Sequence, residues 1–538
     1  MAERALVGRL IEGGRAPALL GGSVALGAAA YLLAVLVPDV GGKVLNGDEA
    51  VAGLVAARPL GEAVATAMWE RGGAPLHFVL AHVALALDPS PEALRWVSVV
   101  FALAAVGVTY DLGRRLGGHG SGAVAAVVAA SSTLLTVYGT FGRMYALFAF
   151  AGGLAADLFL RALRVRTVSA ALAGAGAAVL LPAVHPYGMF PVAAMAIVAA
   201  AVWRGRPLLP AVPVALVGLV LLPLLLADLR LADRFDLGAS VRAQEPVLET
   251  DEVPEYAVDV LQGFAGGHGW MFVALLVVGI VGVVWVARTE PGFVAFAALA
   301  GAFPLLFLLV ASTGPQPYLS TRHFIFALPL WAAFVAAGAV RLGRDWGRGG
   351  RAAILLVVGA VAFLSPAGGI ERREALPPAP PGTFAAAADW VETHVEEDDV
   401  LFPYATVFLE ALPETRHATV LTSRGPGDVV VRGLQRVNFP VRELLVSIRL
   451  DTQADLDAQD LQEKLGAGYE VVLFGPWLLV SARGQIEDEL TLVRRALAIV
   501  EGVDSVVGGW GDVRRYRQPL CVGLASLGEP CVRRPRAR

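Results

Sequence analysis

Acidic, basic and aromatic side chains that could carry out chemistry lie in short segments between long apolar runs. The acids are the adjacent Asp48 and Glu49, and the cations are Arg95, Arg143 and Arg322. Further candidates have polar rings: His77, Tyr145, His185, Tyr187 and His323. A carboxylate can take the proton of an attacking hydroxyl, and a guanidinium offers a planar fork of donors that fits a phosphate. These residue types indicate transfer of a group from an anionic, lipid-linked donor.

Each candidate also has an ordinary structural explanation. An acidic pair that follows an apolar run is most often part of a solvated loop. Arginines near helix ends commonly extend to the membrane surface, tyrosines at that depth form an aromatic belt, and histidines cap helix ends. These explanations are weakest for Arg143 and Arg322. Both lie in short turns that are expected to face outwards, where arginine is normally scarce.

The composition identifies the elements that must hold these residues. Of the 538 residues, 56% are hydrophobic and only 17% are charged, with a net charge of −4. This excludes an ordinary soluble enzyme, in which about 25% of residues are charged, and also a disordered chain or a nucleic-acid-binding protein. Long apolar runs occupy 16–366, whereas 370–538 has the composition of a soluble domain. We predict a polytopic α-helical membrane protein with a C-terminal α/β domain and no nucleic-acid partner.

A helix needs roughly 20 mostly apolar residues to cross a bilayer, and the runs of this kind predict about eleven spans. They lie at 16–37, 94–112, 122–138, 145–163, 168–183, 189–203, 208–227, 270–287, 293–311, 324–340 and 352–366. The apolar run 75–87 is too short and is expected to be an interfacial or re-entrant helix. The short cytoplasmic segments then contain most of the arginines, as the positive-inside rule requires. This multi-pass topology in the cell membrane makes the N-terminus cytoplasmic and the C-terminal domain extracytoplasmic.

The chain is expected to divide into three parts. The membrane module is 1–368 and includes two long outer loops, 38–93 and 228–269. A Pro-rich linker follows at 369–382, and the α/β domain occupies 383–538.

The C-terminal domain alternates strand-like and helical segments. The strand-like runs are 400–402, 429–431, 444–446 and 471–474. No catalytic motif is evident among them, so the domain is expected to pack against the membrane module or to dock the acceptor. Cys521 and Cys531 are equally compatible with a disulfide and with two free thiols.

Several of the short polar segments resemble, in order and spacing, elements of the GT-C class of membrane glycosyltransferases. The resemblance is strongest to the branch of the dolichyl-phosphate-mannose protein mannosyltransferases and the lipid A aminoarabinose transferases. The resembling segments are Asn46–Ala50, Gly73–His77, Leu94–Ser98, Gly113–Gly117, Arg143–Leu147, Thr321–Phe324 and Leu328–Pro329. The likeness, taken over all these segments, extends across most of the range 16–366.

The resemblance implies a glycosyltransferase with its active site at the outer membrane face. The donor would be a polyprenyl-phosphate monosaccharide in the surrounding membrane lipid, and the acceptor an extracytoplasmic protein, lipid or polysaccharide. Asp48 would be the general base, with Glu49 as a second acid beside it. Arg143 and Arg322 would hold the lipid phosphate, with Arg95 as a third candidate. The family usually inverts the anomeric centre. Some relatives bind a divalent metal and others need none, so the cofactor stays open.

Two other functions remain as alternatives. A transporter or lipid flippase places ionisable residues near the bilayer midplane, often on interrupted helices. The apolar spans here are largely free of charge, which disfavours transport. A non-catalytic scaffold or sensor would tolerate replacement of Asp48 and Arg143.

Overall fold

The computed structural model describes most of the chain, in eleven stretches. They are 15–42, 45–70, 74–205, 217–227, 253–265, 269–311, 321–364, 382–422, 427–450, 456–507 and 513–531. The expected linker, apart from Gly382, lies outside the described residues, as does much of the second long outer loop.

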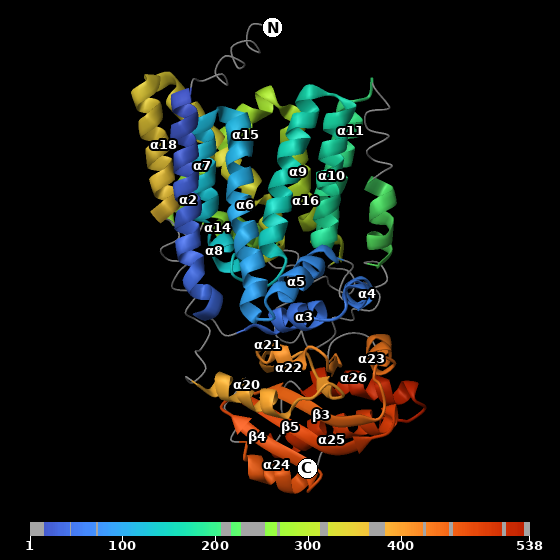
Figure 1. Ribbon diagram of the computed structural model, residues 1–538. Helices are drawn as coiled ribbons and strands as arrows, with labels where there is room; N and C mark the ends of the chain where they lie inside the picture. The colour runs from blue at the N-terminus through green and yellow to red at the C-terminus, as the bar shows by residue number, and fades with distance from the viewer. Residues whose placement is uncertain are drawn as a thin grey trace.

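A bundle of apolar helices forms the larger part of the molecule (Figure 1). Its helices are α2 (Arg15–Gly42), α6 (Pro91–Gly117), α7 (His119–Ala130), α9 (Tyr145–Val165), α10 (Val168–Val184), α11 (Met189–Val202), 217–227, α15 (Trp270–Thr289), α16 (Pro291–Ala311), α17 (Leu328–Gly343) and α18 (Gly347–Leu364). Five segments among the described residues are each long and apolar enough to cross a membrane, and shorter apolar helices pack beside them. The bundle helices correspond to the expected spans, and the polytopic α-helical fold class is confirmed.

The expected single span at 122–138 is wrong. Helix α7 ends at Ala130, and a separate short helix, α8 (Thr133–Tyr138), follows it. The hydroxyl of Ser131 donates to the carbonyl of Val127 at 2.8 Å. The hydroxyl of Ser132 donates to the carbonyl of Gly263 at 3.3 Å, on helix α14 (Val253–Ala265). Serine hydroxyls compete with the helical backbone in this way, and the chain bends at the two serines.

Three short helices cover one end of the bundle and separate it from the C-terminal domain (Figure 1). They are α3 (Gly47–Ala56), α4 (Leu60–Glu70) and α5 (Leu76–Leu87). Helix α5 corresponds to the apolar run that was expected not to span. Its 12 residues extend only about 18 Å, which is too short for a hydrocarbon core of about 30 Å.

The C-terminal domain is built on one mixed sheet with strand order β2-β1-β3-β5-β4. The strands are β1 (Val400–Phe402), β2 (Thr419–Val420), β3 (Val441–Arg449), β4 (Tyr469–Phe474) and β5 (Trp477–Ile486). Strands β2, β1 and β3 are parallel, whereas β5 is antiparallel to both β3 and β4. The helices are α20 (Thr383–His394), α21 (Thr406–Glu410), α22 (Leu412–Thr415), α23 (Gly427–Leu434), α24 (Ala458–Leu465), α25 (Glu489–Val507) and α26 (Val513–Ser526).

The expected strand at 429–431 is wrong, because these residues belong to helix α23. Val430 and Leu434, one helical turn apart, are both buried in the domain core. The three consecutive valines favour a strand by type, but the spacing of the buried positions is that of an amphipathic helix.

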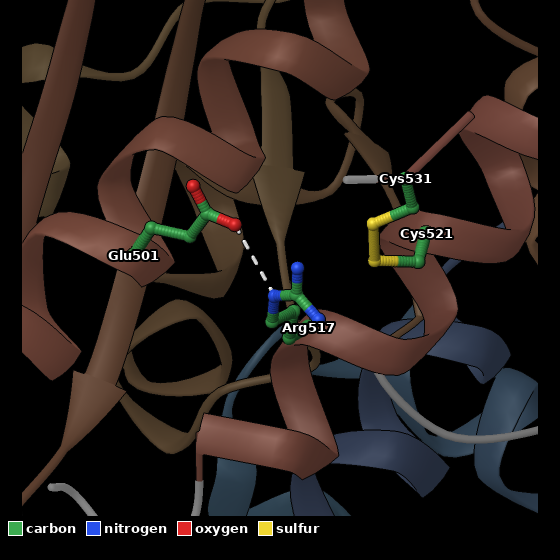
Figure 2. Close-up of a disulfide and its surroundings, with 4 residues drawn as sticks. All are labelled: Glu501, Arg517, Cys521 and Cys531. Atoms are coloured by element: carbon green, nitrogen blue, oxygen red, sulfur yellow. Dashed lines mark hydrogen bonds and ion pairs between the residues drawn. A yellow bond between two sulfur atoms is a disulfide. The ribbon is translucent and has the colours of Figure 1, made fainter. Parts of the chain in front are cut away.

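Cys521 and Cys531 form a disulfide (Figure 2). It joins helix α26 to the segment that follows it. Of the two alternatives that the sequence left open, a disulfide and two free thiols, the structure has the disulfide. The Nε of Arg517 donates to Glu501 at 3.2 Å and ties α26 to α25.

Candidate functional site

The acidic pair lies at the start of α3, on the side of the bundle that faces the C-terminal domain (Figure 1). Asn46 precedes the helix and caps it, with its side-chain oxygen accepting from the backbone N–H of Asp48 at 2.9 Å. The Glu49 carboxylate returns the interaction by accepting from the backbone N–H of Asn46 at 2.9 Å. This capping box fixes both acids at the positive end of the helix dipole.

Glu49 and Arg95 form a buried ion pair. Arg95 donates from Nε and Nη2 to the two oxygens of Glu49, at 3.0 and 3.1 Å. The backbone N–H of Gly142 donates to Oε1 of Glu49 at 2.8 Å, and Nη1 of Arg95 donates to the carbonyl of Val40 at 2.8 Å. Both side chains are therefore engaged in joining α2, α3, α6 and the turn that leads to Arg143. This geometry favours a positioning role for Glu49 and Arg95 over contact with a substrate.

Asp48 points to a different neighbour and remains accessible. Its side chain is 27% exposed, and its Oδ2 lies 4.0 Å from Nη2 of Arg322. Arg322 comes from the segment η2 (Thr321–Ala327), far away in the sequence. The guanidinium of Arg322 also lies over the ring of Tyr145, 5.4 Å from its centre. The structure thus brings together three of the residues that the sequence analysis selected.

Arg143 differs from the other two arginines because it has no carboxylate partner among the described residues. Its Nε is buried and donates to no acceptor among those residues. The backbone of its turn is held by Ser98, whose hydroxyl reaches the carbonyls of Phe141 and Arg143 at 2.5 and 3.2 Å. A partly buried and unpaired guanidinium is costly, and an anion would lower this cost.

The polar rings form one cluster beside the arginines. His185 and His323 have ring centres 4.9 Å apart, and Tyr187 lies 5.1 and 5.0 Å from them. Tyr145 lies 6.2 Å from each histidine. These side chains come from α9, the end of α10, the turn η1 (Pro186–Gly188) and η2. Four separate elements of the chain therefore meet at this end of the bundle.

His77 on α5 is almost completely buried, and neither ring nitrogen has a hydrogen-bond partner among the described residues. Burial, reinforced by the nearby charge of Arg143, lowers the pKa of His77 to about 3. The ring is therefore neutral at physiological pH, and His77 contributes no positive charge to the binding of an anion.

Sequence reasoning did not single out Gly142, Ser98 or Tyr138 as parts of this site. A Cβ atom at position 142 would lie 3.1 Å from Oε1 of Glu49, so the close approach of backbone to carboxylate favours glycine. The ring of Tyr138 lies 4.9 Å from that of Tyr145. Ser98 was included in a resembling segment, which was the available signal for it.

No family model matches the sequence, and no curated protein matches it. Solved structures do match. ArnT from Cupriavidus metallidurans in the apo state has a TM-score of 0.57, covering 85% of this chain and 97% of that protein at 13% identity. The same protein bound to undecaprenyl phosphate has a TM-score of 0.53, covering 86% and 97% at 15% identity. The Archaeoglobus fulgidus oligosaccharyltransferase in complex with Zn and sulfate has a TM-score of 0.50, covering 87% and 73% at 13% identity.

The chain has the GT-C fold. The match covers 85% of this chain, and the fold that the resemblance implied is confirmed. At these low identities the likeness carries the fold alone.

The Zn in one GT-C neighbour raises the question of whether this chain fits a metal. Among the described residues there is no group of three or more His, Cys, Asp or Glu side chains that could hold an ion. The two oxygens of Glu49 already accept four hydrogen bonds, and the cation that faces Asp48 is Arg322. The described residues therefore do not fit a divalent metal.

Proposed function

We propose that this protein is a membrane glycosyltransferase, which moves a sugar from a polyprenyl-phosphate donor to a nucleophilic acceptor. The observation that carries the proposal is the approach of an accessible carboxylate, Asp48, to Arg322 at one end of a GT-C bundle, with Arg143 in the turn whose Gly142 donates to the adjacent Glu49. A neighbour of the same fold binds undecaprenyl phosphate, which supports a donor of this class.

In the proposed reaction, Asp48 accepts the proton of an acceptor hydroxyl or amine. The freed electron pair of the acceptor attacks the anomeric carbon of the sugar. The bond from this carbon to the phosphate oxygen breaks, and the phosphate leaves with that electron pair. A single displacement of this kind inverts the anomeric centre. General-base catalysis typically contributes about 10²–10⁴-fold to the rate.

The two arginines have different parts in this scheme. Arg143 has no carboxylate partner among the described residues, so its charge is available to the donor phosphate. Arg322 lies between Asp48 and the ring of Tyr145, where it can hold the phosphate and also keep the neighbouring carboxylate ionised. Cations near the leaving oxygen stabilise the charge that develops in the transition state.

We propose that the site lies at the extracytoplasmic face. The disulfide Cys521–Cys531 supports this orientation, because structural disulfides persist in oxidising compartments. The odd number of expected spans then leaves the N-terminus in the cytoplasm. The acceptor is correspondingly an extracytoplasmic molecule, and the expected division at 1–368, 369–382 and 383–538 is retained.

Transfer of radiolabelled sugar in membranes tests the proposal. A panel of polyprenyl-phosphate sugars is offered to the wild type, to Asp48→Asn and to Asp88→Asn. Asp88 is an exposed acid in the loop after α5 and serves as the matched control. We expect transfer by the wild type and by Asp88→Asn, with a loss of about 10² or more for Asp48→Asn. Transfer that survives in Asp48→Asn would contradict its role as base, and no transfer from any donor would contradict the enzyme class.

A further inference from the structure

The C-terminal domain packs directly against the helix that carries Asp48. Leu409, on α21, is fully buried against Gly53 of α3. A Cβ atom at position 53 would collide with the side chain of Leu409 and would lie 2.8 Å from Cδ1 of Leu94 on α6. Leu409 thus fills the space that a glycine leaves between α3 and α6.

This contact is one residue away from the ion pair of the site. Leu94 immediately precedes Arg95 in the sequence. Arg95 donates two hydrogen bonds to Glu49, and Glu49 is adjacent to Asp48. A shift of Leu409 would therefore be transmitted to α3 and α6 at the point where they hold the acidic pair.

Two arginines make further polar contacts between the membrane module and the C-terminal domain. Arg58, just after α3, is buried and donates from Nη2 to the Tyr404 hydroxyl at 3.1 Å and to the Val420 carbonyl at 3.0 Å. Arg436 of the C-terminal domain pairs with Glu70 at the end of α4, and its Nη1 donates to Thr66 at 3.3 Å. The end of α3 and the following helix α4 are thus both attached to the C-terminal domain.

The apolar contacts on this surface form one continuous core. Its buried members from the membrane module are Leu45, Ala50, Leu54, Ala56, Ala81, Leu85, Ala93 and Leu94. Those from the C-terminal domain include Ala387, Val391, Leu401, Phe408, Leu409, Leu445, Trp477 and Leu479. A core of this kind resists separation, in contrast to the polar and smaller interfaces between domains that move.

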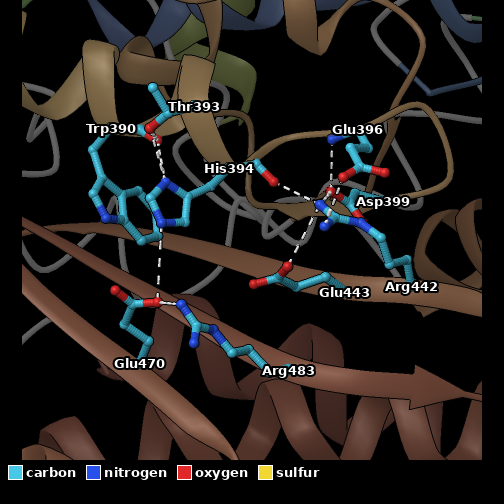
Figure 3. Close-up of polar contacts among 9 residues, drawn as sticks. All are labelled: Trp390, Thr393, His394, Glu396, Asp399, Arg442, Glu443, Glu470 and Arg483. Carbon is cyan, nitrogen blue, oxygen red and sulfur yellow. Dashed lines mark hydrogen bonds and ion pairs between the residues drawn. The ribbon is translucent and has the colours of Figure 1, made fainter.

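Within the C-terminal domain, a network of hydrogen bonds and ion pairs centred on Arg442 supports the part that contacts α3 (Figure 3). Arg442 donates to Asp399 at 2.5 and 3.0 Å and to the carbonyl of His394 at 2.6 Å. His394 ends α20, and Asp399 precedes β1, so this network fixes the membrane-facing layer of the domain to β3. The sheet therefore offers a rigid base for α21.

We infer that the C-terminal domain is a fixed support for α3, and that Leu409 is a positioning residue for Asp48. This inference depends on the proposed function for its kinetic part, but its structural part does not. The domain would keep its contact with α3 throughout turnover and would not open as a lid.

A reversible disulfide cross-link tests whether the C-terminal domain keeps its contact with α3 during turnover. The double variant Gly53→Cys and Leu409→Cys places two thiols at positions that are in contact. A protease site inserted in the linker 369–382 allows the linker to be cut, so that a disulfide between the membrane module and the C-terminal domain is seen as a joined product. We expect the disulfide to form and the oxidised enzyme to keep the activity of its reduced form. Activity that is lost on oxidation and restored by reduction would overturn the inference, as would failure of the disulfide to form.

A pair of matched substitutions tests the positioning role. Leu409→Ala removes the contact with α3, whereas Leu461→Ala makes a similar cavity in the core of the C-terminal domain on α24. We expect Leu409→Ala to lower kcat by about tenfold to a hundredfold, with the donor KM unchanged, because ångström-scale misplacement of a catalytic group has effects of this size. Leu461→Ala should keep the wild-type kcat, and Leu409→Met should restore it. Equal kcat values for the two alanine variants would overturn the role of Leu409. An inactive wild type, together with a cross-link that forms in the double-cysteine variant, would contradict only the proposed function.

Discussion

Glu49 and Arg95 face each other through two hydrogen bonds, of 3.0 and 3.1 Å, and each side chain is more than nine-tenths buried. The pair is electrically neutral as a unit and joins residues 46 positions apart in the sequence. It leaves the adjacent Asp48 as the partly accessible acid of α3. One acid thus holds the helix in place while its neighbour faces the site.

Removal of one partner of this pair should destabilise the protein. Arg95→Ala and Glu49→Ala each leave a buried charge without its counter-ion, a change that typically costs about 3–5 kcal/mol. We expect a large drop in the thermal unfolding midpoint of the purified protein in detergent, whereas Asp48→Asn should unfold near the wild-type temperature. If Arg95→Ala unfolds like the wild type and only raises the donor KM, Arg95 is a phosphate ligand, as the sequence analysis expected.

Replacement of Arg143 should weaken donor use without loss of stability. Arg143→Gln removes an arginine that has no carboxylate partner among the described residues, so no buried charge is left unpaired. A hydrogen bond to a charged group contributes about 1.5–3 kcal/mol, which corresponds to roughly a 10–10²-fold loss in kcat/KM for the donor. Initial rates at varied donor concentration measure this loss. Arg161→Gln, at an exposed position of α9, is the control and should match the wild type. An unchanged kcat/KM in Arg143→Gln would remove Arg143 from the site.

The sequence was sufficient for the fold class because hydrophobic length alone identifies membrane spans, and α5 is visibly too short. It could not distinguish the three arginines. Each lies near the end of an expected span, and a guanidinium fork fits a carboxylate as well as a phosphate. Only the spatial approach of Glu49 to Arg95 separates a structural pair from a candidate ligand.

The break in the span at Ser131 and the helix α23 escaped prediction for similar reasons. A serine is tolerated in an apolar helix, and its hydrogen bond to Val127 is not visible in the sequence. The valines of α23 are strand formers by type, yet the tertiary core selects Val430 and Leu434 at helical spacing. In α23, packing in the domain core outweighs the strand preference of valine. At the two serines, hydrogen bonds, including one to the neighbouring helix α14, outweigh the helical preference of the apolar run.

Removal of divalent metal should leave transfer unchanged. The described residues offer no group of three ligands, and Arg322 is the cation that faces Asp48. We expect the rate in chelator-treated membranes to equal the untreated rate, and addition of Mg²⁺, Mn²⁺ or Zn²⁺ to have no activating effect. A rate that falls with chelator and returns with one of these ions would show that the site contains ligands beyond the described residues.

The contact between α21 and α6 should become more stable as the pH falls. Glu410 on α21 faces Glu92 and Arg95 of α6 and Glu392 of α20, and burial, with repulsion from the two glutamates, raises the pKa of Glu410. A raised folded-state pKa means that ionised Glu410 destabilises the folded protein near neutral pH. This penalty is relieved as the pH falls towards the ordinary glutamate pKa of about 4.3.

Glu410→Gln removes the charge at every pH and isolates this effect from other titrating groups. We expect the variant to unfold at a higher temperature than the wild type at pH 7, and the difference to shrink as the pH is lowered to about 5. Parallel thermal unfolding of the two proteins across this range measures the difference. Glu397→Gln, in the turn after α20, is the control and should show no comparable change. A Glu410→Gln variant that is less stable than the wild type at pH 7 would mean that Glu410 stabilises the contact in its ionised form, by attraction to Arg95.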